Sequence, residues 1–109
     1  MSVLDTILRK KDINAGVKRC RATKGAILLD VRLREEYNFS HIEGARCLPL
    51  EQLSKAPSAM PDKERPVFTY CYKGGRAAKA ARELRKMGYL FVEDIGGIKN
   101  YSGKTVKGK

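Results

Sequence analysis

Apolar runs of strand length alternate with helix-period segments along this chain. Ala26–Val31 is an apolar run closed by a charge, and Val67–Tyr70 is rich in β-branched and aromatic residues, so each predicts a buried strand. Tyr89–Val92 predicts a third strand. After Gly75, apolar positions recur at helical spacing until Gly88 supplies a stop signal. These positions are Ala77, Ala80, Ala81, Leu84 and Met87. The alternation predicts an α/β fold, a central parallel β-sheet flanked by helices on both faces.

Shorter segments add smaller elements to this plan. Asn14 is the candidate N-cap of a helix that ends near residues 23–25. Leu33–Asn38 predicts a turn of helix, and Leu50–Lys55 predicts another short helix. Pro57–Pro66 is polar and punctuated by prolines, which indicates a connection rather than an element.

The length of 109 residues is that of one domain with a single core. Residues 1–12 predict a leading amphipathic helix, capped at Ser2, or a mobile arm, and residues 13–101 form the domain. Residues 102–109 contain three lysines and two glycines, and we expect a basic, flexible tail.

The net charge of +11 predicts a surface that attracts anions by steering as much as by binding. Nucleic-acid binding is not expected, because no reader motif and no aromatics interleaved with the charge are present. No stretch has the 18 or so apolar residues that a membrane span needs, as a rough guide. The N-terminal charges follow the apolar residues, the reverse of a secretory signal, so we expect a cytoplasmic protein with no membrane partner.

The chain contains three cysteines and one histidine, and their spacing bears on metal binding and disulfide formation. Cys20, Cys47 and Cys71 form no CxxC motif, and with His41 alone they make no metal site of the zinc type. An odd count without a secretory signal predicts reduced thiols. Cys20 is expected to be a small buried hydrophobic residue of the helix that Asn14 caps.

The stretch VFTYCYKGGRAAK, residues 67–79, places Cys71 between a predicted strand and a predicted helix. The carboxyl end of a parallel strand is where α/β sheets bind ligands. Gly74 and Gly75 allow the loop to curl until its backbone N–H groups converge, which makes an anion cradle. The helix N-terminus, Lys73 and Arg76 favour the thiolate, the nucleophilic form. This pattern predicts that Cys71 attacks an anionic electrophile or carries an anionic adduct.

The C-x4-R spacing of CYKGGR resembles the active loop of rhodaneses, the thiosulfate sulfurtransferases. LLDVRLREEYNFSHIEGARCLPL resembles the upstream signature of that family, and DIGGIKNY resembles its glycine-glycine segment. Together these stretches cover about residues 13–101, in the order expected for a single-domain rhodanese. The chain differs in having no tryptophan after the double glycine, where it offers Tyr101.

The resemblance implies a role for each matching residue. Cys71 corresponds to the cysteine that forms a persulfide, and the loop that follows it wraps the transferred sulfur. That loop comprises Tyr72, Lys73, Gly74, Gly75 and Arg76. Lys73 and Arg76 are the expected contacts of the anionic end of the donor. Asp30, Arg32 and His41 match family positions that we expect to be structural supports, because an ionised thiolate needs no general base. Cys47 falls in a strand that is buried in the family, so we expect it in the core rather than as a resolving thiol.

The implied reaction moves a sulfane sulfur from thiosulfate, or a related persulfide donor, to a thiol, cyanide or a protein acceptor, with no metal or organic cofactor. Phosphatase or arsenate reductase activity is a second hypothesis for an enzymatic function. The C-x4-R loop argues against it, because phosphatases of related fold have a loop that is one residue longer, C-x5-R. The alternative from another class is a noncatalytic or carrier rhodanese-like module that binds a partner protein in a sulfur relay.

Overall fold

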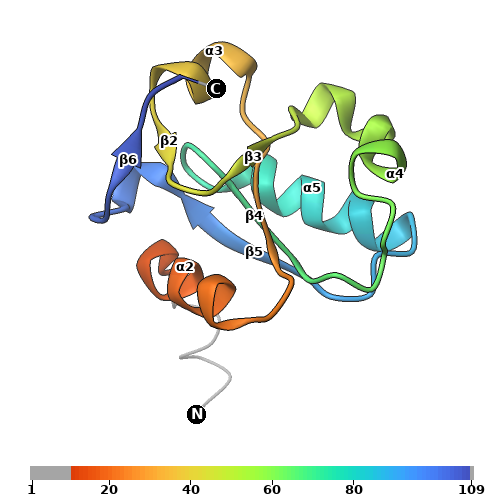
Figure 1. Ribbon diagram of the computed structural model, residues 1–109. Coiled ribbons are helices and arrows are strands. Elements are labelled where there is room, and N and C mark those ends of the chain that lie inside the picture. The colour runs from red at the N-terminus through yellow and green to blue at the C-terminus, as the bar shows by residue number, and fades with distance from the viewer. Residues whose placement is uncertain (1–10, 109) are drawn as a thin grey trace.

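A four-stranded parallel sheet forms the centre of the computed structural model, which describes residues 11–108 (Figure 1). Its strands lie in the order β3-β1-β4-β5. Their bounds are β1 Ile27–Asp30, β3 Arg46–Cys47, β4 Val67–Cys71 and β5 Val92–Gly97. All three pairings in this sheet are parallel, as the predicted α/β class requires.

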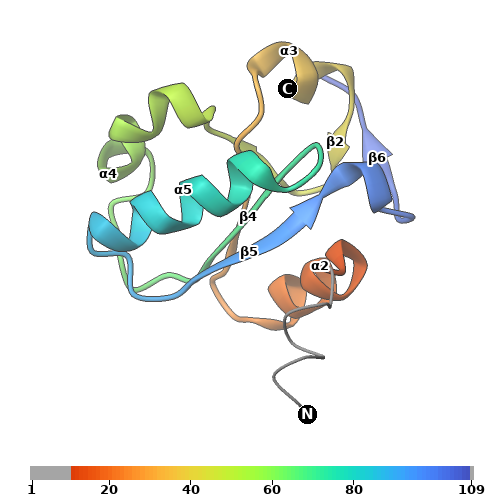
Figure 2. The ribbon, with the colours of Figure 1, turned by 180° about the vertical axis from the view of Figure 1, so that it is seen from behind.

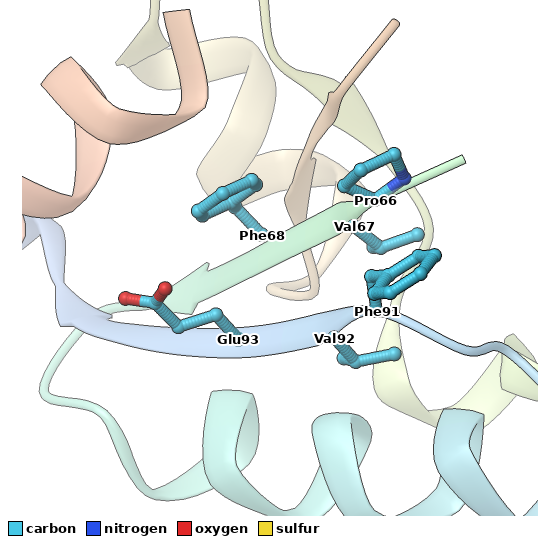
Figure 3. A pocket seen from close by; sticks show the side chains of 6 residues that line it. All are labelled: Pro66, Val67, Phe68, Phe91, Val92 and Glu93. Carbon is cyan, nitrogen blue, oxygen red and sulfur yellow. The ribbon is translucent and has the colours of Figure 1, made fainter. Parts of the chain in front are cut away.

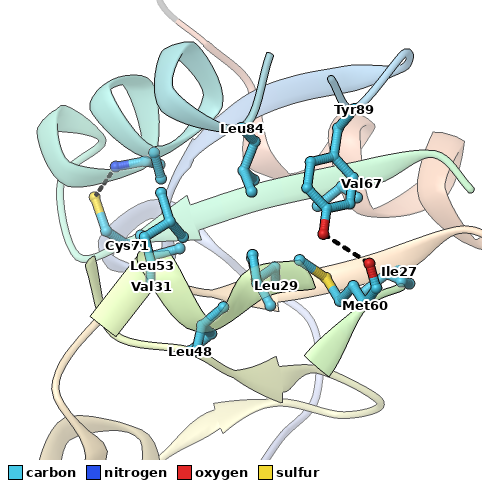
Figure 4. Close-up of a cluster of buried hydrophobic side chains, with 13 residues drawn as sticks. Ile27, Leu29, Val31, Leu48, Leu53, Met60, Val67, Cys71, Leu84 and Tyr89 are labelled. Carbon is cyan, nitrogen blue, oxygen red and sulfur yellow. Dashed lines mark hydrogen bonds between the residues drawn. The ribbon is translucent and has the colours of Figure 1, made fainter. Parts of the chain in front are cut away.

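Helices cover both faces of the sheet (Figures 1 and 2). One face packs against α5, Gly75–Lys86, together with the 3-10 helix η1, Leu50–Lys55, and α4, Ala56–Ala59. The other face packs against α2, Ile13–Ala22, and α3, Arg34–Phe39. The core therefore consists of two apolar layers separated by the sheet, and Figure 4 shows the layer beneath α5.

The alternation of side chains along β4 assigns neighbouring residues to different layers. Val67 and Cys71 belong to the α5 layer, whereas Phe68 and Tyr70 belong to the α2 layer. All five residues of β4 are buried, because β1 and β5 flank it and helices cover both of its faces. Cys71 thus ends the central strand, at the carboxyl edge of the sheet.

The third strand begins later than its composition predicts. The prediction of a strand over Tyr89–Val92 was wrong for residues 89–91. The ring of Tyr89 is buried, and its hydroxyl donates to the Met60 carbonyl at 2.6 Å. Leu90 and Phe91 are exposed, and β5 runs from Val92 to Gly97, paired with β4 from the Val67–Val92 register onward. Hydrogen bonding to the central strand outweighs the poor strand propensity of the acidic and glycine residues of β5.

The N-cap of α2 is Asp12, which corrects the prediction of Asn14. The Asp12 carboxylate accepts hydrogen bonds from the backbone N–H groups of Asn14 at 3.0 Å and Ala15 at 3.3 Å. The Asn14 side chain instead joins α2 to the end of the chain, because it donates to the Asn100 carbonyl and accepts from the Ser102 N–H.

The segment that we expect to be a flexible tail, residues 102–109, contains a short strand. Strand β6, Thr105–Val106, pairs antiparallel with β2, His41–Ile42, in a separate two-stranded sheet. Between β5 and β6 lies the 3-10 helix η2, Ile98–Asn100. The predicted connection after η1 also begins with a helix, because α4 extends to Ala59.

Two expectations concern the N-terminal segment and the membrane. The leading helix predicted near Ser2 lies outside the residues that the structure describes. Among the helices of residues 11–108, none is long and apolar enough to cross a bilayer.

Candidate active site

Cys71 is the last residue of β4, and its sulfur lies at the centre of the loop that leads into α5. The backbone N–H groups of Gly74 and Ala77 point at Sγ, with nitrogen-to-sulfur distances of 3.0 and 3.4 Å. Figure 4 shows the sulfur facing the first turn of α5. Only 1% of Cys71 is exposed, so these donors act on the sulfur away from bulk water. The loop therefore supplies two backbone hydrogen-bond donors to the sulfur.

The loop curls because one glycine adopts a conformation that other residues avoid. Gly74 has φ of 124° and is the N-cap of α5, whereas Gly75 is the first residue of the helix. This turn directs the unpaired N–H groups of the first helical turn, and with them the positive end of the helix dipole, toward Sγ.

The outer side of the loop packs directly on the end of β5. A Cβ atom placed on Gly97 would lie 2.1 Å from the Tyr72 carbonyl oxygen and 2.6 Å from the Lys73 Cα. The same Tyr72 carbonyl accepts a hydrogen bond from the Lys99 N–H at 3.0 Å. The glycine-glycine segment that the sequence singled out thus fixes the position of the loop, with Gly97 paired to Cys71.

Tyr72 and Lys73 project outward from this loop. Tyr72 is 44% exposed, and Lys73 is exposed beside an open depression of about 380 Å³. Lys11, Asp94 and Asn100 contribute the other side chains of the depression, and its remaining lining is glycine. Lys73 can therefore meet an anionic ligand that approaches the loop from solvent.

Arg76 is paired with the carboxylate of Glu36, a residue that was not predicted to be part of the site. Its two terminal nitrogens donate to the two carboxylate oxygens of Glu36 in α3, at 2.7 and 3.1 Å. The hydrogen bond from Arg76 lowers the pKa of Glu36. The Glu36 carboxylate also accepts from the Leu33 N–H at 3.0 Å. The sequence carried a signal for this residue, because Glu36 lies in the LREEY stretch, but only folding shows which of the two glutamates meets the loop.

Asp30 and Arg32 form a buried ion pair at the end of β1. Arg32 Nε and a terminal nitrogen donate to the Asp30 carboxylate at 3.0 and 2.7 Å, and the Arg32 backbone N–H adds a third bond at 2.9 Å. Burial lowers the pKa of Arg32, but the hydrogen bond and charge of Asp30 outweigh it and raise the pKa overall. Arg32 also donates to the Ser40 carbonyl at 2.6 Å. The pair thus ties β1 to the end of α3.

His41 lies in β2, next to α3 rather than in the Cys71 loop. Its ring stacks on Tyr37 at a centroid distance of 3.7 Å, and its Nδ1 is 2.8 Å from the Tyr37 carbonyl. His41 is 4% exposed, so these contacts hold a buried ring in place. The geometry is that of a packed and hydrogen-bonded side chain.

The other two cysteines lie on the opposite side of the sheet from Cys71. Cys20 is buried in the α2 layer, and burial raises its pKa to about 11. Cys47 packs against the same layer, and burial raises its pKa as well. Asp30 of β1 pairs with Cys47 on one side and with Tyr70 of β4 on the other. Two strand spacings therefore separate Cys47 from Tyr70, the neighbour of Cys71, which is about 9–10 Å between the Cα atoms of Cys47 and Tyr70. A disulfide between Cys47 and Cys71 would need a separation below about 7 Å.

A second depression, of about 210 Å³, lies at the other end of the sheet (Figure 3). Pro66, Phe68 and Phe91 form its apolar wall, and Glu93 is its charged residue. Glu93 forms an ion pair with Arg19 of α2, so its negative charge is balanced within the fold. Because Cys71 is at the opposite end of β4, this hollow belongs to a different region of the protein.

Comparison with known proteins identifies the domain to which this loop belongs. Residues 14–104 match the rhodanese-like domain family. The thiosulfate sulfurtransferase PspE of Escherichia coli is 38% identical over 81 residues, which cover 73% of this chain and 78% of that protein. The adenylyltransferase and sulfurtransferase uba4 of Ogataea parapolymorpha is 28% identical over 91% of this chain, but the match covers only 26% of that larger protein.

Solved structures lead to the same family. The structure described as a rhodanese with anions from Escherichia coli superposes with a TM-score of 0.70 and 37% sequence identity, covering 76% of this chain and 99% of that one. The fold, the Cys71 loop and the match over residues 14–104 show that this chain belongs to the rhodanese-like sulfurtransferase family.

Proposed function

We propose that this protein transfers a sulfane sulfur from thiosulfate, or a related persulfide donor, to a thiophilic acceptor through a persulfide on Cys71. The observation that carries the proposal is the sulfur of Cys71, buried at the end of β4 and approached by two backbone N–H groups. That arrangement suits an anionic sulfur nucleophile and an anionic sulfur adduct alike. No cofactor enters the scheme.

In the first step, the Cys71 thiolate attacks the outer sulfur of thiosulfate. A bond forms between Sγ and that sulfur, the sulfur–sulfur bond of thiosulfate breaks, and sulfite leaves with the bonding electron pair. Negative charge then resides on the outer sulfur of the persulfide, and we expect the N–H groups of the Gly74–Ala77 turn, which now point at Sγ, to stabilise that charge. We expect the exposed ammonium of Lys73 to attract the dianionic donor.

In the second step, an acceptor such as cyanide or a thiolate attacks the outer sulfur. The persulfide bond breaks, and Cys71 recovers its thiolate, so the cycle balances without an external oxidant. Arg76 contributes indirectly in this scheme, because its pairing with Glu36 holds the first turn of α5 against α3 while its charge remains near the loop. In a cell, we expect the acceptor to be a thiol or a partner protein, in the cytoplasm.

Steady-state kinetics test the proposal. The wild type should form thiocyanate from thiosulfate and cyanide with the parallel-line pattern of a two-step mechanism, and Cys71→Ser should form none. Cys47→Ser is the matched control and should retain the activity, because Cys47 lies on the other side of the sheet. Absence of thiocyanate with fully reduced wild type would reject thiosulfate as the donor.

A carrier role is the alternative, and one comparison favours it. The match to uba4 shows a similar domain inside a larger protein whose name joins sulfurtransfer to adenylyltransfer. If this chain is a carrier or a partner-binding module in a sulfur relay, Cys71 would take sulfur from a protein persulfide and show little turnover with small donors. Single-turnover transfer from a persulfidated protein donor, compared with thiosulfate turnover, separates the two roles.

A further inference from the structure

The outer face of α5 is strongly cationic. The inner face of this helix is buried through its alanines and Leu84, whereas its exposed side carries four basic residues and one acid, Glu83. The four are Lys79, Arg82, Arg85 and Lys86. In the part of the chain that the structure describes, no other element covers this side of α5 (Figure 2).

Part of this charge is explained by helix stability. Arg85 and Lys86 lie in the last turn, where cations interact favourably with the negative end of the helix dipole. Lys86 also approaches Glu83, with 3.7 Å between the ammonium and a carboxylate oxygen. Near the other end, Arg76 is neutralised by Glu36. These residues need no partner outside the domain.

Arg82 is not explained in this way. Helix geometry gives it three cationic neighbours, Lys79 at i−3, Arg85 at i+3 and Lys86 at i+4. Like charges at these spacings destabilise a helix, so a glutamate would serve the fold better at this position. Lys79 lies in the second turn of α5, with the cation Arg82 at i+3 and the acid Glu83 at i+4. Arg82 therefore lowers the stability of the helix that carries it, whereas the charge of Lys79 is offset by Glu83.

The cationic face begins at the candidate active site. α5 starts within the Cys71 loop, and from Arg76 to Lys86 the helix extends about 15 Å. At the loop end of this face, Leu33 is 41% exposed, and its N–H bonds to the same Glu36 that pairs with Arg76. An exposed apolar side chain next to the Glu36–Arg76 pair and a line of cations leading away from that pair combine the two components of a protein interface.

We propose that the cationic outer face of α5, centred on Lys79 and Arg82, docks an acidic segment of a thiol-bearing protein that receives the sulfur of Cys71. This inference rests on the proposed function, since it names the class of acceptor. Charge complementarity gives the orientation: the acidic segment lies along α5, and the acceptor thiol lies at the loop. A protein is favoured over a nucleic acid because α5 exposes no aromatic residue between its cations for base stacking.

The test uses two synthetic peptides of equal length, each with one cysteine, one rich in glutamate and one neutral. Wild type and Lys79→Gln/Arg82→Gln are loaded as the persulfide, and the rate of sulfur transfer to each peptide thiol is measured at low salt. Lys18→Gln/Lys24→Gln is the matched control, because it removes the same charge from exposed positions on the α2 side of the sheet.

We expect the wild type and the control to transfer sulfur to the acidic peptide about tenfold faster than to the neutral one, the lower end of electrostatic steering effects. In Lys79→Gln/Arg82→Gln this ratio should fall to near one, while the thiosulfate–cyanide rate stays within about twofold, since neither residue belongs to the Cys71 loop, residues 71–76. An unchanged ratio in the double variant would overturn the proposal.

Binding of a cysteine-to-serine version of the acidic peptide separates this inference from the proposed function. If the wild type lacks sulfurtransferase activity yet binds this peptide through Lys79 and Arg82, the proposed function fails and the docking surface stands. If a single-stranded oligonucleotide binds through the same residues more tightly than the peptide at equal ionic strength, the surface serves nucleic acid and the proposal is overturned.

Discussion

Gly97 is the residue on which the shape of the Cys71 loop most directly depends. A Cβ at this position would overlap the Tyr72 carbonyl oxygen, at 2.1 Å, and only backbone movement could relieve the overlap. We expect Gly97→Ala to lower the free energy of unfolding by about 1–3 kcal/mol. Because the loop would be displaced, the sulfurtransferase rate of this variant should also fall at least tenfold. Urea unfolding measures the change in stability, and steady-state kinetics measure the change in rate.

Gly75→Ala is the control for this variant. A Cβ on Gly75 meets no atom within 4 Å, and the residue lies at the first position of α5 without a positive φ. The free energy of unfolding of Gly75→Ala should equal that of the wild type or exceed it by up to about 0.5–1 kcal/mol, because alanine favours the helix. Equal stability of Gly97→Ala and wild type would show that the loop does not need the close approach to β5.

The Glu36–Arg76 pair should make stability depend on pH in the acid range. The hydrogen bond from Arg76 lowers the pKa of Glu36 in the folded protein. The stabilisation is therefore complete above the unfolded pKa, about 4.3, and is lost as the pH falls through the lower folded value. Because both side chains are about one-third exposed, 36% and 32%, we expect Glu36→Gln to lower the free energy of unfolding by only about 0.5–1 kcal/mol at pH 7.

Urea unfolding of wild type and Glu36→Gln between pH 7 and pH 3 checks this expectation. The difference between the two proteins should shrink as the pH falls. Glu35→Gln removes the same charge from the neighbouring, exposed position of α3 and corrects for the helix dipole. A pH-independent difference would mean that packing, rather than the ion pair, is what Glu36 contributes.

At the scale of elements, α5 offers a prediction that is independent of catalysis. Arg82→Glu replaces repulsion from Lys79, Arg85 and Lys86 with attraction, including an i,i+4 pair with Lys86 in the favourable orientation. We expect the free energy of unfolding to rise by about 0.5 kcal/mol, with Arg82→Gln giving a smaller gain. A loss of stability in denaturant titrations would show that Arg82 supports the fold and would remove the reason for assigning it to a partner.

Elements whose signal is local could be predicted from the sequence. β1, β4 and α5 were recognisable because each has the apolar period of its type, and the Cys71 loop was recognisable from the spacing of its glycines and cations. β5 was misplaced because the pairing that defines it comes from β4, 25 residues earlier in the Val67–Val92 register. The pairing of β6 with His41–Ile42 spans an even longer separation. Its two β-branched residues, Thr105 and Val106, are too short a run among lysines and glycines to predict a strand.

Contacts in the candidate site could likewise be predicted when they are local in sequence and could not when they join distant segments. The neighbourhood of Cys71 is contiguous in sequence, so its N–H donors could be expected from the turn alone. The Glu36–Arg76 pair joins α3 to α5 across 40 positions, and its consequence, that Arg76 is partly committed to a structural role, required the fold. Lys73 is exposed in the structure, and its contact with the anionic end of a donor stays a prediction.

At the scale of the whole molecule, the net charge of +11 should affect the rate of encounter with an anionic donor. We expect the second-order rate constant for thiosulfate to fall as salt rises, since the Debye length shrinks from about 30 Å at 0.01 M to about 8 Å at 0.15 M. Stopped-flow measurements of persulfide formation across this range test the expectation. A flat response would exclude steering and leave the chemical steps as proposed.

The central claim is that Cys71 carries the transferred sulfur. Intact mass spectrometry of reduced protein after incubation with thiosulfate alone, without an acceptor, tests it most directly. We predict that the wild type gains the mass of one sulfur atom, that Cys71→Ser gains none and that Cys47→Ser behaves as wild type. A sulfur adduct that persists in Cys71→Ser, or a wild type that stays unmodified by thiosulfate and by a persulfide donor, would contradict the account.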